Sequence, residues 1–133
     1  MSASVVEIAQ RVRFWAEQNN IHGYPDLNCM CGIASAKLHE NLRREGVQCK
    51  IACSSQHVFN IVDDKYVVDI TATQFYNNHP PVLMIPISQA LKYYWTIDNT
   101  FHSVKDFVDY QHRDGWPKKQ IPWWVKTHGK NKS

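Results

Sequence analysis

The sequence predicts an α+β fold in which N-terminal helices pack on one face of a small antiparallel sheet. Apolar residues recur at helical spacing through the first third of the chain, and short β-rich runs separated by turn residues follow. Helices that precede a group of strands favour segregated layers over alternating parallel units. The 133 residues suffice for one core, so we expect a single domain over residues 1–133.

The first helix is expected to begin at a capping box, in which Ser4 is followed by Glu7 three residues later. An apolar stripe with helical spacing continues from there, and the helix is expected to end near Asn19. Glycine and proline within residues 23–28 then predict a loop.

A second helix is expected to begin between Asn28 and Cys31. Its end is predicted by Gly46, which stands where a glycine commonly closes a helix in the left-handed conformation. The apolar stripe of this helix consists of Ala34, Leu38 and Leu42.

Strands are expected over residues 47–53, 58–62 and 66–70, because these runs are rich in apolar and β-branched side chains. Asp63 and Asp64 lie between the second and third runs and predict a hairpin turn.

The last third of the chain contains weaker patterns. Residues 82–87 are expected to form a short strand and residues 88–95 a short helix, and Ser103 with Asp106 begins a further amphipathic helix. The lysine-rich end, residues 126–133, is expected to be frayed.

Composition limits the classes of partner. The formal net charge is only +3, which does not favour nucleic acid as a partner. The N-terminus carries no basic-then-apolar signal and no apolar run is long enough for a membrane, so a cytoplasmic location without membrane contact is expected. In the cytosol the four cysteines are expected to remain thiols.

Cys31, His57 and Asp69 form a candidate catalytic triad. A cysteine in the first turn of a helix is favoured as thiolate by the unpaired N–H groups and the helix dipole. His57 at the start of a strand supplies a base, and Asp69, among apolar residues of the next strand, supplies a carboxylate that orients the ring.

The hairpin between the two strands provides a geometric condition. Opposed residues of an antiparallel pair share a face, and the sum of their numbers is constant. His57 and Asp69 share a face only if that sum is even. We therefore expect a loop of three or five residues, or a bulge, around Asp63 and Asp64.

These motifs resemble the transglutaminase-like branch of the papain-like cysteine fold. The resemblance covers about residues 28–75: Cys31 opens a helix that ends at Gly46, His57-x-Phe59 enters a strand, and residues 66–71 (Tyr-Val-Val-Asp-Ile-Thr) end the next. Residues 69–75 are also similar to a motif in small bacterial and phage proteins of this kind. The resemblance implies a papain-like core and a peptidase, deamidase or transglutaminase that acts on a protein or peptide amide through a thioester, without a cofactor.

The resemblance also assigns supporting residues. Phe59 replaces the usual tryptophan after the histidine, and Asn28 is the nearest amide to the usual oxyanion-hole glutamine. Thr71 and Gln74 are expected to support the end of the hairpin. Cys29 remains a second candidate nucleophile. Cys31 is preferred because its distance from Gly46 fits the family helix and because the two cysteines point to different helix faces.

Two other functions compete with this hypothesis. A metal site could use four ligands from Cys29, Cys31, Cys49, Cys53 and His57, although Cys-x-Cys is tight for a zinc knuckle. A non-catalytic module could bind peptide or nucleic acid through the aromatic and lysine-rich C-terminal part. Its aromatic residues are Tyr93, Tyr94, Trp95, Trp116, Trp123 and Trp124.

Overall fold

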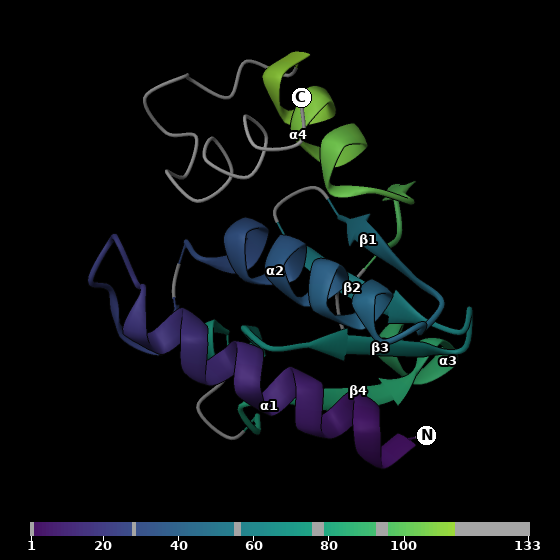
Figure 1. The fold of residues 1–133 in the computed structure, drawn as a ribbon, viewed down its shortest axis with the longest axis horizontal. Coiled ribbons are helices and arrows are strands. Elements are labelled where there is room, and N and C mark those ends of the chain that lie inside the picture. Colours follow the sequence, from purple (N-terminus) through teal and green to yellow (C-terminus); the bar gives the residue numbers. More distant parts are fainter. Residues whose placement is uncertain (1, 28, 55–56, 76–78, 93–95, 114–133) are drawn as a thin grey trace.

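Two N-terminal helices lie across one face of an antiparallel sheet in the computed structural model of the chain (Figure 1). The structure describes residues 2–27, 29–54, 57–75, 79–92 and 96–113. The first two helices precede the strands as expected, and the strand β5, Asn99–Phe101, was not predicted. The predicted α+β class, with N-terminal helices packed on a small antiparallel sheet, is therefore confirmed.

Helix α1, Ser2–Gln18, follows the predicted apolar periodicity. It begins two residues before the predicted cap, so Ser4 is a helical residue and the capping-box prediction is wrong. Alanine and serine are tolerated in a first helical turn, which allows the helix to extend to Ser2. The buried stripe consists of Val5, Ile8, Ala9, Val12 and Ala16.

Helix α2, Cys31–Arg44, buries the predicted stripe against α1 and the sheet. It ends as the sequence predicts. Gly46 has φ of 79°, its N–H donates to the carbonyl of Arg43 at 3.0 Å, and the N–H of Val47 donates to the carbonyl of Leu42 at 3.0 Å. This pair of bonds is a Schellman motif, which satisfies the last carbonyls of the helix.

Among the described residues, five strands form one sheet in the order β4-β3-β2-β1-β5, and every neighbouring pair is antiparallel. The strands are β1 Cys49–Cys53, β2 Val58–Val62, β3 Tyr66–Asp69, β4 Leu83–Pro86 and β5 Asn99–Phe101.

Both faces of the sheet carry apolar side chains. Val58 and Val62 of β2 pack with the helices α1 and α2, while Phe59 and Ile61 pack in a second cluster with Ala90 on the opposite face. Strand β2 is consequently buried along its whole length. A central strand of this kind can hold neighbouring side chains in fixed positions on either face.

The hairpin between β2 and β3 meets the geometric condition set by the sequence. Asn60 pairs with Val68 and Val62 pairs with Tyr66, so the sum of paired residue numbers is even. The loop contains three residues, 63–65, of which Asp63 and Asp64 have φ of 55° and 54°. The predicted odd-length loop is confirmed, and His57 and Asp69 fall on the same face.

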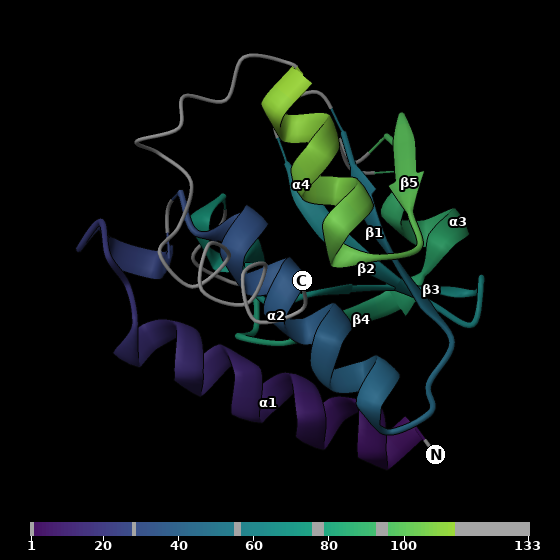
Figure 2. The same cartoon turned by 45° about the horizontal axis from the view of Figure 1, so that its top comes forward.

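The remaining elements complete the sheet edges. Strand β4 confirms the predicted strand, whereas the next helix, α3 Ile87–Ala90, is shorter than predicted. Helix α4, Val104–Arg113, begins after Ser103, whose hydroxyl accepts a hydrogen bond from the N–H of Asp106 at 3.1 Å. Figure 2 shows α4 beside β5, where Phe107 contacts Phe101 with ring centroids 5.8 Å apart.

Several predictions concern residues outside the described part. These are the lysine-rich tail, the supporting role of Asn28 and the aromatic residues 93–95, 116, 123 and 124. Within the described ranges, no helix combines the length and the apolar character needed to cross a membrane.

Substitution of Gly46 tests the helix end. The side chain in Gly46→Ala would meet no atom within 4 Å, so its only cost is the left-handed backbone. We expect Gly46→Ala to lower the free energy of unfolding by about 1–2 kcal/mol, and Gly46→Asn to lower it less. Urea denaturation measures both changes. An alanine variant as stable as the wild type would contradict the helix end described here.

Candidate active site

Cys31 is the first residue of α2, where the sequence places the nucleophile. The residue before it, Met30, is the N-cap and is completely buried, and no side chain caps the helix there. Cys31 itself is only half-buried. Its backbone N–H is one of the amides that an α-helix leaves without an internal acceptor.

Cys29, the alternative nucleophile, lies outside the helix. It is exposed and its φ is 72°, a left-handed value. The two cysteines therefore occupy different backbone settings, one before the helix and one within it. Cys31 contributes to the raised pKa of His57.

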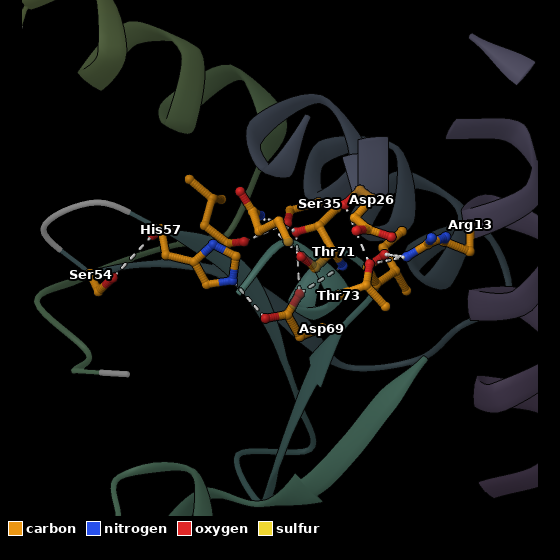
Figure 3. A network of polar contacts seen from close by, with 11 residues as sticks. Arg13, Asp26, Ser35, Ser54, His57, Asp69, Thr71 and Thr73 are labelled. Carbon is orange, nitrogen blue, oxygen red and sulfur yellow. Dashed lines mark hydrogen bonds and ion pairs between the residues drawn. The ribbon is translucent and has the colours of Figure 1, made fainter. Parts of the chain in front are cut away.

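His57 and Asp69 form a buried pair at the end of the β2–β3 hairpin (Figure 3). The imidazole Nε2 lies 2.6 Å from Asp69 Oδ2, and the two residues are 5% and 0% exposed. The even register of the hairpin places both on one face, so their side chains meet without distortion of the strands.

The surroundings of His57 favour its protonated form. Burial lowers the pKa of the ring, but the charge of Asp69 and hydrogen bonds with Asp69 and Cys31 outweigh burial and raise the pKa to about 9. Since Nε2 faces Asp69, Nδ1 is the ring nitrogen that is left to exchange a proton with the Cys31 thiol. The imidazole therefore presents one nitrogen to the carboxylate and has the other nitrogen left for the thiol.

The second oxygen of Asp69 is held by the residues that follow β3. Asp69 Oδ1 accepts hydrogen bonds from the Thr71 N–H at 2.8 Å and from the Thr71 hydroxyl at 3.3 Å. Gln74, at the end of the 3₁₀ turn η2 (Ala72–Gln74), donates from Nε2 to the Thr71 carbonyl at 3.0 Å and to its hydroxyl oxygen at 3.1 Å. The structure therefore brings Thr71 to the carboxylate, and Gln74 holds Thr71 in turn.

Two phenylalanine rings surround the imidazole. Phe59 lies with its ring centroid 5.7 Å from that of His57, as expected for the aromatic position of the motif. Phe75 meets the imidazole edge-on at 4.7 Å and is 36% exposed, so it stands between the pair and solvent. The role of Phe75 was not predicted. The available signal was its place directly after the turn that follows Asp69.

Polar contacts join α2 to β2 close to Cys31 and His57 in the sequence. The Ser35 hydroxyl donates to the carbonyl of Val58 at 3.1 Å, and Asn60 Nδ2 donates to the carbonyl of Ser35 at 3.0 Å. Ser35 lies one helical turn after Cys31, and Val58 directly follows His57. Neither residue was predicted, although an asparagine inside a buried apolar strand is a recognisable signal.

The other two cysteines are buried in the core. Cys49 Sγ lies 3.4 Å from His39 Nδ1, and burial raises the pKa of Cys49 to about 11. Burial likewise raises the pKa of Cys53 to about 12. Among the residues described, no three His, Cys, Asp or Glu side chains form a group that could hold a metal ion. The competing metal-site hypothesis thus gains no support from the geometry.

The structure brings together Cys31, His57, Asp69 and most of the predicted supporting residues. Asn28 is the exception, since it lies outside the described residues. Comparisons of the chain with protein-family models, with curated proteins and with solved structures found no match.

The raised pKa of His57 predicts a pH-dependent stability. A group whose pKa is higher in the folded state stabilises fully below its unfolded value, here 6.5, and this stabilisation disappears as the pH rises through about 9. We expect the wild type to lose on the order of 3 kcal/mol in this window, relative to His57→Gln/Asp69→Asn, since one pKa unit corresponds to about 1.4 kcal/mol.

Urea unfolding of both proteins at several pH values measures this difference. The other shifted groups titrate outside the window: the pKa of His39 is lowered by burial, and those of Cys49 and Cys53 are raised above 9 by burial. Parallel stability curves between pH 6.5 and 9 would show that the pair does not hold a proton as described.

Proposed function

We propose that this chain is a cysteine-dependent acyl-transfer enzyme with a papain-like, transglutaminase-like core. The observation that carries the proposal is the buried 2.6 Å pair of His57 and Asp69, together with Cys31 at the start of a helix, which also helps to raise the pKa of His57. Order and topology support it as well: a cysteine-bearing helix precedes two antiparallel strands that carry the histidine and the aspartate.

In the first half-reaction, Cys31 attacks a carboxamide or peptide carbonyl. His57 takes the proton of the thiol as the sulfur attacks, and its raised pKa favours retention of this proton on the imidazole. His57 then donates this proton to the leaving amine, and a thioester remains on Cys31. Asp69 stabilises the imidazolium and keeps Nδ1 directed toward the thiol.

The negative charge of the tetrahedral intermediate requires a donor. The N–H of Cys31 serves this purpose, because it lies at the N-terminal end of α2, where the helix dipole adds positive potential. We infer that Asn28 contributes a second donor. A preorganised donor of this kind typically accelerates acyl transfer by about 10²–10³-fold.

In the second half-reaction, the neutral imidazole takes a proton from water or from a second amine, which attacks the thioester. Water gives a peptidase or deamidase and an amine gives a transglutaminase. Phe59 and Phe75 flank the imidazole and limit access of water to the reacting atoms. A protein or peptide amide is the proposed substrate, and the reactive thiol is suited to a reducing, cytoplasmic compartment.

Alkylation by iodoacetamide tests the nucleophile directly. We expect Cys31 to react at pH 6 at least about tenfold faster than it does in His57→Ala, because only the thiolate is alkylated and His57 stabilises it. Each cysteine is followed by mass spectrometry over a range of pH. Cys29→Ser is the matched control and should leave the rate at Cys31 unchanged. Equal rates at Cys31 in the wild type and in His57→Ala would refute the proposed activation.

Product analysis tests the reaction itself. Glutamine-containing peptides are incubated with and without a primary amine, and peptide cleavage, ammonia release and amine incorporation are measured. We expect one of these products, its loss in Cys31→Ser, and a fall in kcat of about 10²–10⁴-fold in Asp69→Asn. Turnover that persists in Cys31→Ser would show that another group performs the chemistry.

A further inference from the structure

Arg13 crosses from α1 to the end of β3, beneath the candidate site. Its guanidinium donates from Nη1 to the Ile70 carbonyl at 3.0 Å and to the Thr73 hydroxyl oxygen at 2.9 Å (Figure 3). Nε donates to Glu17 Oε2 at 2.9 Å. Arg13 is only 8% exposed, and an arginine is rarely buried unless its donors are satisfied in this way.

Thr73 extends the contact of Arg13 to the loop before Cys31. The Thr73 hydroxyl accepts the bond from Arg13 and donates to the carbonyl of Asp26 at 3.3 Å. Asp26 belongs to the 3₁₀ turn η1 (Pro25–Leu27), which lies beside η2. A series of hydrogen bonds therefore connects α1 with η2 and η2 with η1.

The segment that these hydrogen bonds reach has an unfavourable, left-handed backbone conformation. Asp26, Leu27 and Cys29 have φ of 57°, 58° and 72°, and none of them is glycine. Each left-handed residue of this kind costs on the order of 1 kcal/mol and persists only where its surroundings enforce it. The Leu27 carbonyl then accepts the N–H of Met30 at 2.9 Å, which leads directly into Cys31.

The other contact of Arg13 is made by the same nitrogen, Nη1, with the residue that follows Asp69. Ile70 stands between Asp69 and Thr71, the two residues that hold the imidazole and its carboxylate. One guanidinium thus touches the segment that follows the carboxylate and, through Thr73, the turn η1 that precedes Cys31. Its contacts therefore connect the segment after Asp69 with the turn that leads into Cys31.

We infer that Arg13 is a positioning residue, which acts through Thr73 to hold the turn η1 against the Asp69 segment and so places Cys31 at His57. The inference rests on the proposed function for its effect on chemistry. Arg13 does not touch the reacting atoms, and its charge is compensated by Glu17.

Thr73→Val is the most selective test, because it removes the hydroxyl relay and keeps the side-chain volume. We expect the rate of Cys31 alkylation at pH 7 to fall by about tenfold to a hundredfold, with its pH profile moved toward that of His57→Ala. Thr73→Ser should restore both. Arg13→Met should behave like Thr73→Val, whereas Arg11→Met, an equivalent change at a 76% exposed position of the same helix, should not.

Urea unfolding and hydrogen exchange of residues 24–30 accompany these measurements. We expect faster exchange in this loop in Thr73→Val, with exchange in β1 unchanged. If Arg13→Met does not fold, Thr73→Val decides. A folded Thr73→Val with wild-type alkylation profile and wild-type loop exchange would overturn the inference, as would loss of stability alone without a change in either.

The same experiment separates this inference from the proposed function. If wild-type Cys31 reacts no faster than Cys31 in His57→Ala, the proposed function fails. Loop exchange then decides on Arg13 alone: faster exchange in Thr73→Val and in Arg13→Met supports its hold on the loop, and unchanged exchange refutes it.

Discussion

The burial of the His57–Asp69 pair constrains the elements around it. A carboxylate with no exposed surface is tolerated only when both oxygens have hydrogen-bond partners. Here His57 bonds Oδ2 of Asp69 and Thr71 bonds Oδ1. Removal of one member of such a pair typically costs about 3–5 kcal/mol, because the other is left buried without its partner. The hairpin register, the turn η2 and the aromatic rings can therefore be understood as conditions that let these two side chains meet in a dry setting.

Two sets of hydrogen bonds then fix the thiol relative to this pair. One joins α2 to β2 through Ser35 and Asn60, next to His57. The other joins α1 to the two 3₁₀ turns through Arg13 and Thr73. Both sets join elements that are far apart in sequence. Apolar packing alone would allow these elements to slide against each other more easily. A site whose parts come from separate layers needs such directional contacts, since dispersion forces have little angular preference.

The sequence predicted the elements whose signals are local. Helical periodicity located α1 and α2, Gly46 located the end of α2, and the parity argument predicted the loop length between His57 and Asp69. Strand β5 was missed because its three residues show no alternation and its pairing with β1 depends on chain folding. Arg13 was missed for a related reason: its partners Ile70 and Thr73 lie almost sixty residues away, and an arginine in an amphipathic helix is usually exposed.

The three-residue loop 63–65 also restricts how this gene can change over time. Adding or deleting a single codon there would shift the pairing by one residue and turn the Asp69 side chain toward the helices, unless a bulge absorbed the change. Gain or loss of two codons would preserve the face. Length variation at this loop among descendants of the sequence should therefore occur in steps of two, even though the loop is remote from the thiol.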